Sequence, residues 1–197
     1  MVLHGLFDDS EGWLALASGT RRPCIALDLP GFGGSGLPVA SHLGAYADDV
    51  AAGLDALGLD ACTLVGHSLG GAVAAHVAER SPAVHSLCLL APAGIGRIPL
   101  ADLVARRGVI ALAQLALPLG LVNPLAFAGP VAALWGARDA LVPPAHAERL
   151  AAAAPGAHVE LWEGMGHHPQ RERPRSLARF VEEHAARPVG TSGTAAA

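Results

Sequence analysis

Short apolar runs alternate along the chain with longer segments, rich in Ala and Leu, in which apolar residues recur at helical spacing. This alternation is typical of a mostly parallel β-sheet whose strands are joined by crossover helices. We place strands at residues 22–27, 62–65, 84–90, 131–135 and 158–162, and helices near residues 43–57, 71–80, 144–154 and 175–184. The pattern therefore predicts an α/β fold with about five or six strands.

The length of the chain, 197 residues, suits one domain with one core. We assign residues 1–187 to that domain. Within it, residues 94–127 are expected to form a short apolar lid. The tail at residues 188–197 consists mainly of Gly, Ser, Thr and Ala, so we expect it to be disordered.

Composition narrows the function classes. Hydrophobic residues make up 52% of the chain and aromatic residues only 4%, so we expect a core of Ala, Val and Leu. The formal net charge is -4 and the sequence contains no lysine, so no basic stripe suggests a nucleic-acid partner. The absence of lysine also excludes a Schiff-base lysine and a Walker-type phosphate loop.

The cysteines Cys24, Cys62 and Cys88 lie in apolar runs without the paired spacing of a disulfide framework or a zinc site. We expect them to be reduced thiols. The pair His167-His168 has no further ligands nearby at useful spacing, so we expect no metal. The pattern implies no other cofactor.

The N-terminal sequence MVLHG shows no charged region, long apolar stretch or cleavage site, so a cytoplasmic location is expected. The longest apolar stretch, at about residues 109–122, is shorter than the ~20 residues of a membrane helix and is broken by Gln114 and Pro118. We therefore expect no stable membrane insertion. A homodimer is compatible with the pattern, which does not fix the oligomeric state.

The segment at residues 66–71, GHSLGG, lies between a predicted strand and a predicted helix. A nucleophile elbow has this context: a sharp strand-to-helix turn exposes a serine, and flanking glycines remove side chains that would collide. Ser68 is the candidate nucleophile. The N–H of Leu69, at the start of the helix, is a candidate oxyanion donor. The alternative is a glycine-rich turn that carries a serine by chance.

A serine hydroxyl needs a base, and the base needs an orienting carboxylate. Asp139 follows the predicted strand 131–135, at the same sheet edge as Ser68. Its alternative role is to cap the next helix, but Pro143 and Pro144 suggest a later helix start. After the strand 158–162, the sequence GMGHHP brings His167 and His168 to that edge, and position alone does not separate the two histidines.

Taken together, these motifs resemble the α/β-hydrolase superfamily, in its branch of esterases, haloperoxidase-like enzymes and related acyl hydrolases. The resemblance spans nearly the whole chain. The matching residues are His4-Gly5, DLPGFG at residues 28–33, residues 66–71, Gly136 with Asp139, and Gly166-His167 followed by Pro169, Glu172 and Pro174.

The resemblance implies a catalytic triad of Ser68, Asp139 and His167, because the family's base directly follows the glycine. It also implies that the residue after His-Gly, here Leu6, donates the second oxyanion N–H beside Leu69. His67 is then expected to support the site without acting in catalysis.

Two features depart from the family pattern. Relatives usually have strands before the His-Gly strand and a longer helical cap, and both are shortened here. We therefore expect an α/β-hydrolase fold, a mostly parallel sheet flanked by helices, that lacks the usual N-terminal strands and has a reduced cap. Either substrate contact or ordinary core packing would explain the apolar residues of the lid, which are Leu100, Leu103, Val104, Leu112, Leu115 and Leu117.

The sequence thus favours a serine esterase that cleaves short to medium acyl esters, a small-molecule substrate, through an acyl-enzyme. Thioesters, lactones and amides stay open. The alternatives are an acyltransferase or perhydrolase with the same triad, and a non-catalytic binding protein of the same fold. A serine at position 68 argues against epoxide hydrolases and haloalkane dehalogenases, which have Asp there.

Overall fold

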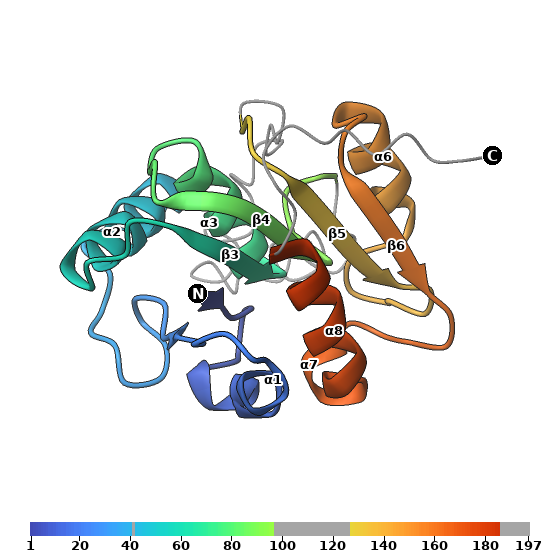
Figure 1. The fold of residues 1–197 in the computed structure, drawn as a ribbon, viewed down its shortest axis with the longest axis horizontal. Coiled ribbons are helices and arrows are strands. Elements are labelled where there is room, and N and C mark those ends of the chain that lie inside the picture. Colours follow the sequence, from blue (N-terminus) through green and yellow to red (C-terminus); the bar gives the residue numbers. More distant parts are fainter. Residues whose placement is uncertain (41, 97–126, 186–197) are drawn as a thin grey trace, which may run out of the picture.

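The computed structural model describes residues 1–40, 42–96 and 127–185, whose strands form one six-stranded parallel sheet (Figure 1). The strand order is β2-β1-β3-β4-β5-β6, and each neighbouring pair is parallel. The strands are β1 (Val2–Leu3), β2 (Ala26–Leu27), β3 (Cys62–His67), β4 (Val84–Leu90), β5 (Val131–Gly136) and β6 (His158–Trp162).

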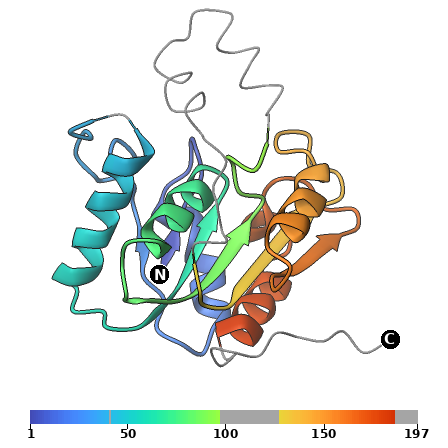
Figure 2. The same cartoon turned by 90° about the horizontal axis from the view of Figure 1, so that it is seen from above.

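Helices cover both faces of the sheet (Figure 2). They are the 3-10 helix η1 (Ser10–Trp13) and the α-helices α1 (Leu14–Gly19), α2 (Leu43–Ala56), α3 (Leu69–Ala78), α6 (Ala145–Ala153), α7 (Pro169–Glu172) and α8 (Pro174–Ala185). Side chains of α2, α3 and α6 belong to one hydrophobic cluster, and those of η1, α1 and α8 to another.

The central strands β3, β4 and β5 are largely buried on both faces, whereas β2 and β6, at the two edges of the sheet, are only half-buried. Along β4, Leu87 and Leu89 belong to the first cluster, whereas Cys88 and Leu90 belong to the second. This is the alternation that a strand's period of two requires. Burial on both faces explains why β4 and β5 read in the sequence as almost continuous apolar runs.

The topology brings several loops to one edge of the sheet. Because all strands are parallel, their carboxyl ends lie at the same edge. Strand β2 pairs with one side of β1, and β3, the next strand in the sequence, pairs with the other side. The strand order therefore changes direction between β1 and β3, which makes a topological switch point there. Such points are where α/β sheets commonly bind ligands. The loops that follow β1, β3, β5 and β6 therefore share this edge.

The predicted parallel sheet with flanking helices is confirmed, and β4 and β6 have the predicted bounds. The strand predicted at residues 22–27 is shorter, because β2 pairs only with β1, in the register Val2↔Ala26, and Pro23 has no N–H to donate. The helix predicted from residue 71 begins earlier, at Leu69. The sequence did not predict η1, α1 or α7.

Two predictions fall on residues outside those described. These are the lid, apart from its first and last residues, and the disordered tail. The named lid residues, Leu100, Leu103, Val104, Leu112, Leu115 and Leu117, all belong to that part of the chain. In the ranges that the structure does describe, no helix is long and apolar enough to cross a bilayer.

Candidate active site

Ser68 lies between β3 and α3 with φ 52° and ψ -115°. A non-glycine residue in such a conformation costs on the order of 1–3 kcal/mol and persists only where its surroundings hold it. The Ser68 N–H donates to the carbonyl oxygen of Leu90 at 2.9 Å. Its own carbonyl oxygen accepts from the N–H groups of Gly71 at 3.0 Å and Ala93 at 2.9 Å. The strained turn is therefore held on both sides.

Glycines let the turn approach its neighbours closely. A Cβ at Gly66 would lie 2.4 Å from the carbonyl oxygen of Gly70. One at Gly70 would lie 2.4 Å from that of His4. A Cβ at Gly5 would lie 3.1 Å from the Cβ of Ser68. The start of α3 can therefore sit against β1 and the loop that follows it only because these positions lack side chains.

Asp139 and His167 form a buried pair. His167 Nδ1 lies 2.7 Å from Asp139 Oδ2, and the Asp139 side chain has no exposed surface. The other carboxylate oxygen accepts from the N–H groups of Leu141 at 2.9 Å and Val142 at 2.8 Å. Because a carboxylate at Nδ1 keeps the proton there, Nε2 of a neutral His167 is left as the basic nitrogen.

Asp139 does not cap the following helix. The N-cap of α6 is Pro144, which provides no side-chain cap. The Asp139 oxygen that is not bonded to His167 instead closes the local loop through Leu141 and Val142. These two bonds orient the carboxylate independently of its contact with His167.

His67, directly before Ser68, contacts the loop after β6 that carries His167 and His168, here called the histidine loop. Its Nε2 donates to the carbonyl oxygen of His167 at 2.8 Å. Burial lowers the pKa of His67 well below its ordinary value, and nearby His167 and His168 add to this. A neutral His67 with its proton on Nε2 has a bare Nδ1, which has no partner within the described residues. His67 is therefore placed to hold the loop.

The rings of His67, His167 and His168 converge, with centroids 4.7 to 5.5 Å apart. Asp139 hydrogen-bonds His167, and no such bond to His168 is found in the described part of the chain. Burial, followed by the neighbouring His167, lowers the pKa of His168. In the same ranges, no three His, Cys, Asp or Glu residues are grouped so that they could hold a metal ion.

Glu172 holds the backbone on either side of His167, a role that the sequence did not reveal. One carboxylate oxygen accepts from the N–H of Gly166 at 2.8 Å and the other from the N–H of His168 at 3.1 Å. Glu172 is part of the family motif quoted above, so a signal existed. Only the fold shows what the carboxylate binds.

The loop after β1 forms a turn at residues 5–8. The N–H of Leu29 donates to His4 Nε2 at 3.0 Å, so the proton of a neutral His4 is on Nδ1. That Nδ1–H donates to the carbonyl oxygen of Gly5 at 2.7 Å. The N–H groups of Leu6 and Leu69 have no acceptor among the described residues, so both are available to a ligand.

The structure brings together Asp139 and His167 but records no hydrogen bond to Ser68 Oγ in the described ranges. Ser68 and His167 are linked indirectly, because His67, which precedes Ser68, donates to the His167 carbonyl oxygen. Catalytic hydrogen bonds are often long in unliganded enzymes and tighten around a substrate.

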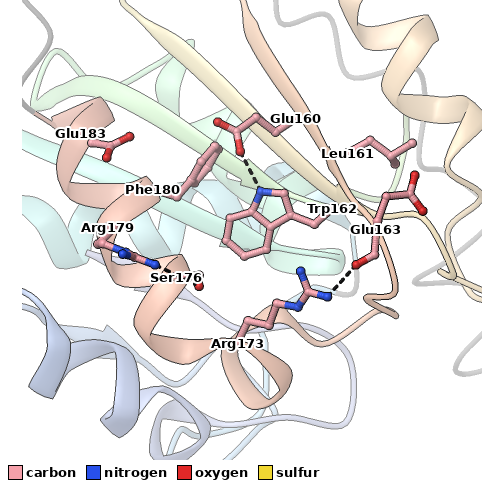
Figure 3. A pocket seen from close by; sticks show the side chains of 9 residues that line it. All are labelled: Glu160, Leu161, Trp162, Glu163, Arg173, Ser176, Arg179, Phe180 and Glu183. Atoms are coloured by element: carbon pink, nitrogen blue, oxygen red, sulfur yellow. Dashed lines mark hydrogen bonds between the residues drawn. The ribbon is translucent and has the colours of Figure 1, made fainter.

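A separate hollow of about 380 Å³ lies between β6 and α8 (Figure 3). None of Ser68, Asp139 and His167 lines it. Two of its polar side chains are paired: the Trp162 indole N–H donates to Glu160 at 2.7 Å, and Arg173 donates to the Glu163 carbonyl at 2.6 Å. The candidate residues at the sheet edge therefore lie apart from this hollow.

The family model described as the alpha/beta hydrolase fold matches residues 1–114. Among curated proteins, the chain is 30% identical over 238 residues to the dihydrolipoyllysine-residue acetyltransferase component of the acetoin cleaving system of Cupriavidus necator, covering 93% of this chain and 62% of that protein. It is 28% identical over 251 residues to an uncharacterised protein of Mycobacterium tuberculosis, covering 92% of this chain and 72% of that protein.

Among solved structures, the chain is similar to a thermophilic esterase from Thermogutta terrifontis. The TM-score is 0.78 with 23% sequence identity, and the alignment covers 92% of this chain and 87% of the other. At this identity the likeness establishes a shared fold.

Proposed function

Because the chain belongs to the alpha/beta hydrolase fold family, which supports a hydrolase or an acyltransferase, we propose that it is a serine esterase with Ser68 as nucleophile, His167 as base and Asp139 as acid. The observation that carries the proposal is the buried contact of 2.7 Å between Asp139 and His167. It joins two loops at the sheet edge that also holds the strained Ser68 turn.

The first step acylates the enzyme. His167 Nε2 takes the proton of Ser68 as Oγ attacks the ester carbonyl, and Asp139 stabilises the imidazolium through Nδ1. The N–H groups of Leu6 and Leu69 bind the oxygen that becomes negative. When the tetrahedral intermediate collapses, the bond to the leaving oxygen breaks, and the alcohol departs with the proton from His167.

The second step releases the acid. Water replaces the alcohol, His167 removes its proton, and the resulting nucleophile attacks the acyl-Ser68 carbonyl. The same two N–H groups hold the second oxyanion. Collapse breaks the bond to Ser68 Oγ, which regains its proton from His167, and the carboxylic acid leaves.

The proposed substrates are esters of short to medium acyl chain. Two exposed apolar side chains in the loops of the site support this class: Phe7, which follows Leu6, is 76% exposed, and Leu141, two residues after Asp139, is 36% exposed. A long chain gains about 0.8 kcal/mol per buried CH₂ only where apolar walls extend along it. A reduced cap, as the sequence predicts, would offer only a short wall.

The second candidate is acyl transfer with the same triad, in which another nucleophile outcompetes water. One observation favours it: the relative from Cupriavidus necator that is 30% identical is described as an acetyltransferase component. A thiol or alcohol acceptor would then attack the acyl-Ser68 carbonyl in place of water. The third candidate, a binding protein of this fold, requires that Ser68 forms no acyl intermediate.

A panel of p-nitrophenyl esters from two to sixteen carbons tests the proposal. We expect kcat/KM to be highest for short chains and to fall with length, and Ser68→Ala to abolish turnover. A steady rise toward sixteen carbons would replace the esterase by a lipase. Adding thiol and alcohol acceptors and measuring the acyl products separates hydrolysis from transfer. An inactive wild-type protein would favour the binding protein.

A further inference from the structure

We propose that Asp8 is a positioning residue which, through Gln170 and Arg171, fixes the turn bearing the Leu6 N–H relative to the loop bearing His167. This inference rests on the proposed function, since it concerns how the oxyanion donor and the base are kept in register. The partners lie far apart in the sequence, and within the described residues none of the three has a hydrogen bond to the Ser68 or His167 side chain.

The direction of the Leu6 N–H is set by the peptide unit that it shares with the Gly5 carbonyl. That unit is planar and trans, so its N–H and C=O point in opposite directions. The Gly5 oxygen accepts from the His4 ring at 2.7 Å and from the Asp8 N–H at 3.3 Å. His4 and Asp8 thereby aim the Leu6 N–H away from themselves.

The turn does not hold itself in shape. Phe7, its third residue, has φ 59°, in the left-handed region that costs a non-glycine residue on the order of 1–2 kcal/mol. Phe7 is also 76% exposed, so its side chain adds little packing. An anchor at Asp8, the last residue of the turn, opposes relaxation of this backbone.

The Asp8 carboxylate is buried, and both of its oxygens accept hydrogen bonds. The residue is 8% exposed, and its Oδ1 accepts from Arg171 Nη2 at 2.7 Å while Oδ2 accepts from Gln170 Nε2 at 3.1 Å. Gln170 is itself 1% exposed. A Cβ at Gly12 would lie 2.6 Å from Asp8 Oδ1, so the carboxylate occupies space that a glycine leaves free.

The other end of this connection is α7, the short helix that carries Gln170 and Arg171 and starts at Pro169. Its last residue, Glu172, accepts the N–H groups on both sides of His167. Helix α7 therefore binds both the turn at residues 5–8, through Asp8, and the loop that carries His167, through Glu172. A shift of Asp8 is transmitted to the geometry between the Leu6 N–H and His167.

The transition state needs both groups in place, whereas substrate binding does not depend on Asp8. Misplacing a catalytic group by about 1 Å can cost about 100-fold in rate. Loss of the anchor should therefore lower kcat by about tenfold to 100-fold and change KM less than twofold. A merely structural residue would lower the melting temperature and leave kcat unchanged at temperatures where the variant is folded.

The test compares Asp8→Asn and Arg171→Met in the full chain, with p-nitrophenyl acetate as substrate. Glu11→Gln and Arg175→Met are matched controls, because both side chains are exposed. The Arg171 side chain is 58% exposed, so its variant should fold even if Asp8→Asn does not. Arg171→Met should lose less kcat than Asp8→Asn, because it keeps the carboxylate that accepts from Gln170, whereas the asparagine keeps only one acceptor oxygen and must pair with a turned Gln170 amide.

Amide hydrogen exchange of residues 4–8 and 166–168 supplies a readout independent of activity. We expect each variant to speed exchange in both segments, although Asp8 and Arg171 belong to different loops. Exchange that changes only in the mutated loop, or a kcat within twofold of the controls, would overturn the proposal. If the wild-type protein hydrolyses no ester, the proposed function fails, and exchange alone still decides whether the two loops are coupled.

Discussion

Gly70 and Gly53 both lie within helices, yet replacing each with Ala should have opposite effects. In a helix, Ala is favoured over Gly by about 1 kcal/mol. A Cβ at Gly53 in α2 meets no atom within 4 Å, so this gain should appear in full. At Gly70 in α3, the same Cβ would lie 2.4 Å from two backbone oxygens of Leu3 and His4.

The clash sets the size of the effect. Contact below 3.0 Å forces a shift, so α3 and β1 must separate by about 0.6 Å. Overpacking of this kind costs about 1–3 kcal/mol, which offsets or exceeds the gain in helix propensity. Because α3 carries the Leu69 N–H and follows Ser68, the same shift should lower kcat by at least about tenfold.

Thermal unfolding and turnover of p-nitrophenyl acetate measure both consequences. For a domain of this size, about 1 kcal/mol corresponds to a change of about 2–4 °C in Tm. Gly53→Ala should raise Tm by this amount and leave kcat unchanged. Gly70→Ala should lower kcat and show none of that rise in Tm. If Gly70→Ala were as stable and as active as Gly53→Ala, the close approach of α3 to β1 would be refuted.

His167→Ala should remove nearly all turnover while His168→Ala retains much of it, and the opposite ranking in steady-state assays would reassign the base. Combining His167→Ala with Ser68→Ala should add little to either loss, because the two residues act as a unit; additive losses would argue against a triad. Since the pKa of His67 is lowered in the folded state, the unfolded chain binds more protons below about pH 6.5. Denaturant unfolding should thus show that the free energy of unfolding falls from pH 7 to pH 5 by up to about 1.4 kcal/mol per pH unit. His67→Asn should make this slope shallower. A variant with the same slope as the wild-type protein would contradict a neutral His67.

Much of the fold and of the candidate site was readable from the sequence because its determinants are local. The apolar runs at β4 and β6 are bounded by clear breaks, and the glycines around Ser68 mark the sharp turn. The contact between Asp139 and His167 follows from placing both after neighbouring parallel strands. Each of these inferences needs only short segments and the period of a strand.

The features that were missed depend on contacts between distant segments. Helix α7 has four residues, too few for a periodic pattern, and Asp8 meets Gln170 across 162 positions of sequence. The left-handed backbone of Phe7 has no residue signature, since such positions usually carry glycine. His167 and His168 differ by one position, and only the contact with Asp139 tells them apart without the family resemblance.

Mass spectrometry after treatment with a fluorophosphonate tests most directly whether Ser68 is an activated nucleophile. We expect one covalent adduct on the folded wild-type chain, located on Ser68 by peptide mapping. His167→Ala should label far more slowly, and Ser68→Ala should carry no adduct. An adduct on another serine, or none on the folded wild-type protein, would contradict the account.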